Sequence, residues 1–259
     1  MIYGSAGLSG LAGWRLLRRT EATQTDLLGR EASVRREQQA FTDKMAAKPT
    51  AQGLVDDYRS LKVALTAFGL EADLPNRAFI RKVLESDLTD SKSLANRLSD
   101  KRYRAFAATF QFGQDTRPSD ASIAAKVSAL YVTREFERRV GEADQTMRLA
   151  LNARRELGAL ATRSATETTK WYEILGNTAL SRVVKTGLGL PESLGKAPVD
   201  AQVAAMSQAA SQRLGISGPD GLADPAKLDR LIDSYVARAG TAQATPYNAA
   251  LTILSTLRR

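Results

Sequence analysis

The chain has 259 residues and a formal net charge of +9, and it contains neither cysteine nor histidine. The absence of cysteine excludes disulfides, thiolate nucleophiles, iron–sulfur clusters and cysteine zinc sites. The absence of histidine excludes the commonest general base, the usual catalytic triads and most transition-metal sites. The sequence also lacks an EF-hand, a P-loop and a G-x-G-x-x-G motif. We expect no cofactor, no metal ion and no catalytic residue, with a site for Mg²⁺ or Ca²⁺ made of carboxylates alone as the open alternative.

The cationic side chains are mixed with 28 acidic ones, without long runs of like charge. Nucleic-acid-binding proteins of this size usually segregate their charge more, so nucleic acid is not the partner we expect. The longest weakly polar stretch, Gly4 to Trp14, is too short to span a bilayer and lacks the preceding basic region of a secretory signal. We therefore expect no membrane span, and either a cytoplasmic location or export without a cleaved signal.

The first predicted helix covers residues 14–47 and carries a thin apolar stripe. Its members are Leu27, Val34, Phe41 and Met45, spaced by seven, seven and four residues. Such a narrow stripe is typical of a helix that packs along one side only, or of one that meets a partner. We interpret residues 1–47 as an N-terminal helix that binds a partner, and we expect the remainder to stay folded without it.

Apolar residues at helical spacing continue through the rest of the chain, and no segment alternates with period two over a useful length. The prediction is an all-α, multi-helix bundle, with Gly, Pro, Ser and Asp marking one internal linker. Its expected parts are a first helical module at 50–112, the linker at 113–120, a second module at 121–240 and a C-terminal helix at 241–259. The apolar face of that last helix consists of Leu251, Leu254 and Leu257.

Two pairs of segments look alike, which suggests two related helix–turn–helix modules joined by long helices. "ALTAFGLEADLP" resembles "VVKTGLGLPESL", and "LTDSKSLANRL" resembles "LADPAKLDRL". The distance between the paired segments differs in the two halves. Chance recurrence of helix and turn signals therefore stands as the alternative.

Polar chemistry is densest in "LTDSKSLANRLSDKRYRAF", residues 88–106. One hypothesis gathers Asp87, Asp90 and Asp100 around a divalent ion. The hypothesis that we favour is structural: Asp90 caps the helix that begins near Leu94, and Ser99 or Asp100 caps the next one. The structural hypothesis leaves Asp87 without an assigned role, and the role of Tyr103 stays open.

The segments "LVDDYRSLKVALTAFGLE" and "IRKVLESDLTDSKSLANRLSDKRYRAFAATFQFG" resemble a bacterial family known as domain of unknown function 1217. "WYEILGNTALSRVVKTGLGLP" and "LADPAKLDRLIDSYVAR" resemble its C-terminal part. The resemblance implies an association with flagellar genes, because members of the family often lie among them. It implies no enzymatic activity and supplies no catalytic residues.

The resulting hypothesis is a non-enzymatic helical protein that acts in flagellum assembly or structure through protein–protein contacts. Its expected contact surfaces are the stripe and the C-terminal helix, with self-association through the terminal helices left open. The alternative is a basic binder of nucleic acid or another anionic surface. The residues of that alternative surface are Arg77, Arg81, Lys82, Arg97, Lys101 and Arg104.

Overall fold

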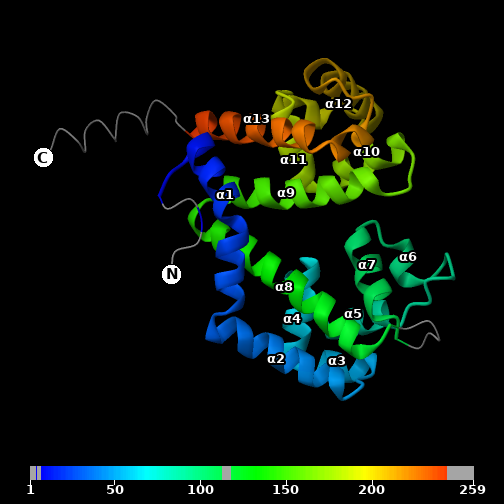
Figure 1. The fold of residues 1–259 in the computed structure, drawn as a ribbon. Coiled ribbons are helices and arrows are strands. Elements are labelled where there is room, and N and C mark those ends of the chain that lie inside the picture. Colours follow the sequence, from blue (N-terminus) through cyan, green and yellow to red (C-terminus); the bar gives the residue numbers. More distant parts are fainter. Residues whose placement is uncertain (1–3, 5–6, 113–117, 244–259) are drawn as a thin grey trace, which may run out of the picture. The chain divides into compact units, whose positions relative to one another are not determined.

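The computed structural model describes residue 4, residues 7–112 and residues 118–243. All regular structure in these residues is helical, which confirms the predicted all-α, multi-helix fold (Figure 1). None of the described helices combines the length and the apolar character needed to cross a membrane. The chain divides into two compact units: unit 1 is Met1–Thr20 with Arg139–Arg259, and unit 2 is Glu21–Arg138.

The unit boundaries fall inside two helices, α1 (Gly10–Gly29) and α8 (Asp120–Ala143). The division expected from the sequence lies instead at 113–120, of which only residues 118–120 are described. Gly, Pro and Ser mark where the chain turns, but they do not indicate which helices pack together afterwards. The start of the chain is therefore part of both units rather than a separate segment.

Unit 2 is a bundle of short helices between the end of α1 and the start of α8. Within it, α4 packs against both α2 and α7, and α5 also contacts α7. The Phe106 ring lies 5.3 Å from that of Phe68, and this edge-to-face pair joins α7 to α4. Within α7, the Phe106 and Phe110 rings lie 5.1 Å apart, also edge to face. The elements are α2 (Ala32–Ala46), α3 (Ala51–Asp56), α4 (Tyr58–Phe68), the 3-10 helix η1 (Glu71–Asp73), α5 (Arg77–Leu84), α6 (Leu94–Arg97) and α7 (Lys101–Phe110).

The predicted helix at 14–47 is in fact two helices. Glu31 has extended backbone angles (φ −61°, ψ 138°) and separates α1 from α2. Gly29, the last residue of α1, favours this ending because glycine is a poor helix former. The chain breaks again at Asp57, whose carboxylate accepts a 2.8 Å hydrogen bond from the Ser60 N–H and caps α4.

Unit 1 is built around α13, which packs against α9 and α11; Figure 1 shows these three helices side by side. Its core includes Ile174, Val183, Ile232 and Val236, none of which is exposed to solvent. The elements are α9 (Gln145–Thr162), α10 (Glu167–Gly176), α11 (Thr178–Gly187), the 3-10 helix η2 (Glu192–Lys196), α12 (Val199–Leu214), the 3-10 helix η3 (Pro219–Ala223) and α13 (Pro225–Gln243).

The suspected internal repeat has a structural counterpart at two helix ends. Gly69 after α4 and Gly189 after α11 adopt the left-handed conformation, with φ of 69° and 64°. The next residue of each turn donates back into its helix, Leu70 to the Leu65 carbonyl (2.8 Å) and Leu190 to that of Lys185 (2.9 Å). These bonds define a Schellman ending, which favours glycine. The other pair of segments diverges, because α6 has 4 residues and α13 has 19.

Candidate functional site

The dense polar stretch lies in unit 2, where it connects α5 to α7 through two hydrogen-bonded turns. Asp87 accepts hydrogen bonds from the backbone N–H (2.8 Å) and the hydroxyl (2.7 Å) of Thr89. These bonds hold the pKa of Asp87 below its usual value. Asp90 accepts one from the Lys92 N–H at 2.8 Å. The prediction that Asp90 caps the next helix is wrong, because α6 begins only after Ser93 and Asp90 closes the turn before it.

Asn96 is the residue that ties this loop to α7. Its amide nitrogen donates to the carbonyls of Leu88 (3.0 Å) and Asp90 (2.8 Å). Its amide oxygen accepts from Arg104 Nε at 2.9 Å. One side chain thus satisfies two loop carbonyls and a guanidinium, a structural role that the sequence analysis had not assigned to it.

Asp100 caps α7, which confirms one of the two capping residues proposed from the sequence. Its carboxylate accepts from the Arg102 N–H at 2.9 Å and pairs with the Arg102 guanidinium. Burial raises the pKa of Asp100, but the hydrogen bonds and charge of Arg102 outweigh burial and leave that pKa below its usual value. Arg102 also donates to the Gly69 carbonyl and so connects this cap to the end of α4.

Tyr103 has a structural partner as well. Its hydroxyl donates to Asp73 in η1 at 2.5 Å, and its ring meets Phe79 edge to face at 5.3 Å. Burial, followed by the hydrogen bond to Asp73, raises the pKa of Tyr103 to about 12. A phenol with so high a pKa stays protonated near neutral pH, which suits a hydrogen-bond donor between α7 and η1 better than a general base.

The divalent-ion hypothesis required Asp87, Asp90 and Asp100 to converge. Each of these carboxylates instead accepts hydrogen bonds from the backbone of its own turn. Within the described ranges, no three acidic side chains are placed to hold a metal ion together.

A hollow of about 470 Å³ lies on this same loop, lined by Lys92, Leu94, Arg97 and Leu98. The two leucines are half-buried and the two cations are exposed. The hollow therefore combines an apolar floor with positive charge. This arrangement makes it a candidate binding site of unit 2.

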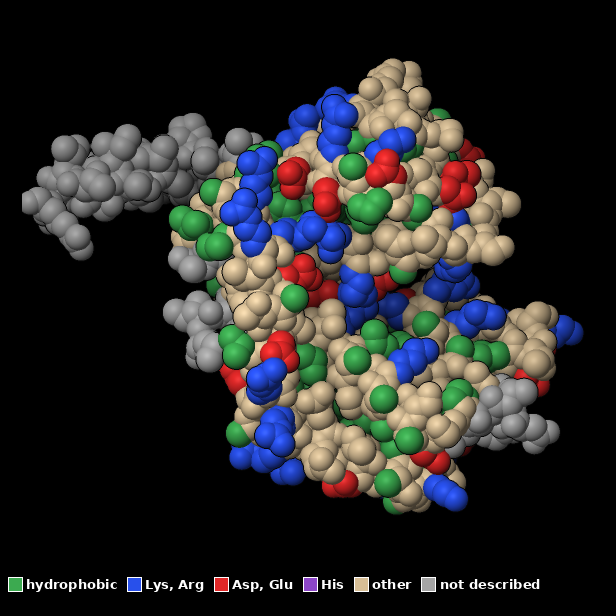
Figure 2. Space-filling view, viewed as in Figure 1, with side chains coloured by type: hydrophobic (Ala, Val, Ile, Leu, Met, Phe, Trp, Pro, Cys, Tyr) green, Lys and Arg blue, Asp and Glu red, His purple; other side chains and the backbone are tan. Residues whose placement is uncertain are grey.

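The predicted anionic surface is only partly available for binding. Three of its cations already donate hydrogen bonds within unit 2. Arg81 donates to Gln52 (2.7 Å), Lys101 to the Leu98 carbonyl (3.1 Å) and Arg104 to Asn96 (2.9 Å). The others are exposed at the surface: Arg77, Lys82 and Arg97. On the face drawn in Figure 2, Lys and Arg are interspersed with acidic and hydrophobic side chains.

The stripe predicted to bind a partner lies mostly in the core of unit 2. Val34 is 2% exposed, and Phe41 and Met45 are fully buried. Phe41 meets the Phe110 ring at 6.4 Å, so α7 of the same chain contributes to covering the stripe. This corrects the expectation of an open surface. Only Leu27, at 40%, remains exposed. The second expected surface, Leu251, Leu254 and Leu257, lies outside the described residues.

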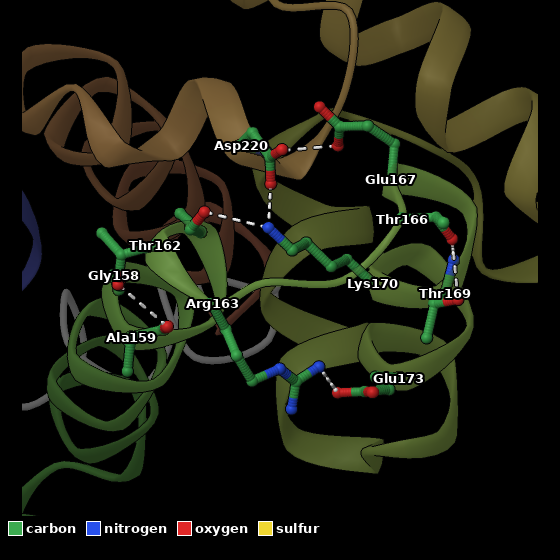
Figure 3. Close-up of polar contacts among 11 residues, drawn as sticks. Gly158, Ala159, Thr162, Arg163, Thr166, Glu167, Thr169, Lys170, Glu173 and Asp220 are labelled. Carbon is green, nitrogen blue, oxygen red and sulfur yellow. Dashed lines mark hydrogen bonds and ion pairs between the residues drawn. The ribbon is translucent and has the colours of Figure 1, made fainter.

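Unit 1 contains a buried lysine, shown in Figure 3, that the sequence analysis did not single out. Lys170 on α10 is 1% exposed. Its Nζ donates to the Ala161 carbonyl at the end of α9 (3.0 Å) and to the Asp220 carboxylate in η3. The Asp220 N–H in turn donates to Glu167 at 3.2 Å. Lys170 thereby joins three elements and satisfies a carbonyl at a helix end.

The surroundings of Lys170 are also bonded to one another. Arg163 donates to Glu173 at 2.5 Å, and Thr166 caps α10 by accepting from the Thr169 N–H at 3.2 Å. Figure 3 shows these pairs around the lysine. The arrangement is that of a structural tie rather than of an open reactive amine. The sequence feature that indicates a buried lysine is its spacing: Lys170 precedes Ile174 by four residues and so lies on the apolar side of the helix.

Comparisons with known proteins agree with this architecture. The family described as "Protein of unknown function (DUF1217)" matches residues 67–228. Among solved structures, the crystal structure of protein AGR_C_984 from Agrobacterium tumefaciens is similar, with a TM-score of 0.70 and 27% identity. The match covers 86% of this chain and 89% of that one. No curated protein matches the sequence.

Proposed function

The chain belongs to the family described as "Protein of unknown function (DUF1217)", and we propose that it is a non-enzymatic protein that binds another protein in flagellum assembly or structure. It acts in the cytoplasm or in the flagellum itself. The flagellar part of the proposal rests on the resemblance described above, whose members often lie among flagellar genes.

The observation that carries the proposal is the hollow on the loop between α5 and α7. Its exposed cations Lys92 and Arg97 stand beside half-buried leucines, on a loop that hydrogen bonds of Asp87, Asp90 and Asn96 hold in place. Protein interfaces combine an apolar centre with a polar rim, and the hollow offers both kinds of surface. The reactive-looking residues around it, Asp100 and Tyr103, maintain the fold instead.

Photo-crosslinking in cells tests this proposal. A photoreactive amino acid at Ser91, which is exposed beside Lys92, should form adducts with a flagellar component. The same amino acid at Thr168, exposed in unit 1, serves as the matched control and should not form them. Deletion of the gene should also reduce swimming. Normal swimming together with the absence of flagellar adducts from Ser91 would contradict the proposal.

A further inference from the structure

We propose that the hollow lined by Lys92, Leu94, Arg97 and Leu98 binds an acidic segment of a protein partner. A carboxylate of that segment pairs with the two cations, and an apolar side chain of the segment packs between the two leucines. This inference rests on the proposed function and specifies the chemistry of the partner.

The charges of the hollow are available to a ligand. In the part of the chain that the structure describes, neither the Lys92 amine nor the Arg97 guanidinium has a hydrogen-bond or ion-pair partner. The nearby carboxylate of Asp90 is used in its own turn. An occupant that covers the leucines also withdraws these cations from water, so it has to bring negative charge with it. A carboxylate matches the planar fork of an arginine.

The size and stiffness of the hollow suit side chains of a peptide. A volume of about 470 Å³ accommodates a few side chains. The loop is held by the turns of Asp87 and Asp90 and by the bonds of Asn96. A loop that is already ordered loses little conformational entropy on binding, which favours affinity.

Other occupants fit these observations less well. The terminal segment of this chain, residues 244–259, contains Arg258 and Arg259 and no acid, so its charge opposes binding. Single-stranded nucleic acid is usually held by stacking on aromatic rings. The hollow offers leucines, and the ring of Tyr103 is engaged with Phe79. A membrane surface requires protruding apolar side chains, whereas Leu94 and Leu98 are half-buried.

Fluorescence anisotropy with the full chain and three synthetic peptides tests the inference. The probe is a labelled peptide of Asp, Glu and Leu. One control peptide replaces each acid by its amide, and the other replaces each Leu by Ser. We expect the probe to bind, with affinity that falls as salt is added. Both control peptides should bind about tenfold more weakly or worse.

Variants then locate the binding. The double substitution Lys92→Gln and Arg97→Gln should lower the affinity for the probe peptide at least about tenfold. Lys126→Gln with Arg230→Gln removes the same charge from exposed positions elsewhere and should leave affinity nearly unchanged. Lys92→Arg with Arg97→Lys keeps the charge and should retain binding. Equal loss in the first two double variants would overturn the inference, because binding would then follow net charge alone.

Two further probes separate the partner classes. The first probe is a single-stranded oligonucleotide and the second is a suspension of anionic lipid vesicles. If either one binds more tightly than the acidic peptide, and if the Lys92–Arg97 double variant loses that binding, the inference is overturned in favour of a phosphate-bearing ligand. If the peptide does not bind but flagellar adducts still form from Ser91, the inference of an acidic partner segment is overturned and the proposed function stands. If neither peptide binding nor flagellar adducts are seen, both proposals are overturned.

Discussion

The indole Nε1 of Trp14 donates a 3.0 Å hydrogen bond to Asp233, joining the start of α1 to α13 across 219 residues of sequence. Trp14 is 1% exposed and Leu17 is fully buried. One turn after Trp14, Arg18 pairs with Asp229 at 2.7 Å. The beginning of the chain therefore completes the core of unit 1, and removing residues 1–47 is expected to unfold that unit rather than to spare it.

Trp14→Ala should lower the free energy of unfolding by about 3–5 kcal/mol, because it leaves a large cavity and an unpaired Asp233. Trp14→Phe keeps much of the packing and should lose less. Urea denaturation measures both values. Leu27→Ala, at an exposed position, is the control and should stay within about 0.5 kcal/mol of the parent. Equal stability of Trp14→Ala and Leu27→Ala would contradict the role given to α1.

Asp229 makes the same junction sensitive to acid. Burial raises the pKa of Asp229, but hydrogen bonds from Arg18 and Arg154 outweigh burial and leave it below the ordinary value of 3.8. A carboxyl whose pKa is depressed by folding stabilises the protein above its unfolded pKa, and this contribution is lost as pH falls through the folded value. Asp229→Asn should therefore destabilise at neutral pH and progressively less below about pH 4. Urea midpoints measured across that range check this, and a penalty that does not change with pH would contradict it.

The sequence predicted the helical class, and it narrowed the cap of α7 to Ser99 or Asp100, because both depend on local spacing and local hydrogen bonds. The prediction that the stripe binds a partner was wrong. Apolar residues seven apart lie on one face of a helix, and this pattern does not show whether a helix of the same chain or of another chain covers that face. Val34 and Phe41 are consequently buried in unit 2 instead of awaiting a partner. The role of Tyr103 depends on Asp73, thirty residues earlier. Contacts over such distances follow from packing, which spacing along the chain does not specify.

Tyr103→Phe should reduce stability by about 1 kcal/mol, because Asp73 loses a hydrogen-bond donor. The pH dependence differs from that of Asp229. A phenol whose pKa is raised from 10.0 to about 12 by folding contributes stability that is complete below pH 10 and is lost as pH rises toward 12. Absorbance titration of phenolate should show one late-titrating group fewer in the variant. An unchanged late step would contradict the assignment to Tyr103.

Lys170 and Asp220 should behave as a coupled pair. Asp220→Asn leaves the ammonium without its counter-charge, and we expect a loss of roughly 2–4 kcal/mol, moderated by water because Asp220 is half exposed. Lys170→Met has similar volume and no charge, so its loss should be smaller. The double variant should resemble Lys170→Met. If the two losses simply add, the pair is not coupled and the lysine is held by other contacts.

At Gly187, α11 lies close against α13. A Cβ at this position would lie 2.8 Å from the Leu231 backbone oxygen and 2.8 Å from its Cδ1. The Ser234 hydroxyl also donates to the Gly187 carbonyl at 2.7 Å, which fixes the approach of the two helices. Gly187→Ala should separate them and lower stability by about 1–3 kcal/mol, although alanine is the better helix former.

A Cβ at Gly195 would meet nothing within 4 Å, so Gly195→Ala is the matched control and should be neutral or slightly stabilising. Thermal unfolding of both variants decides the point, since an equal response at the two glycines would show that the helices can separate without loss.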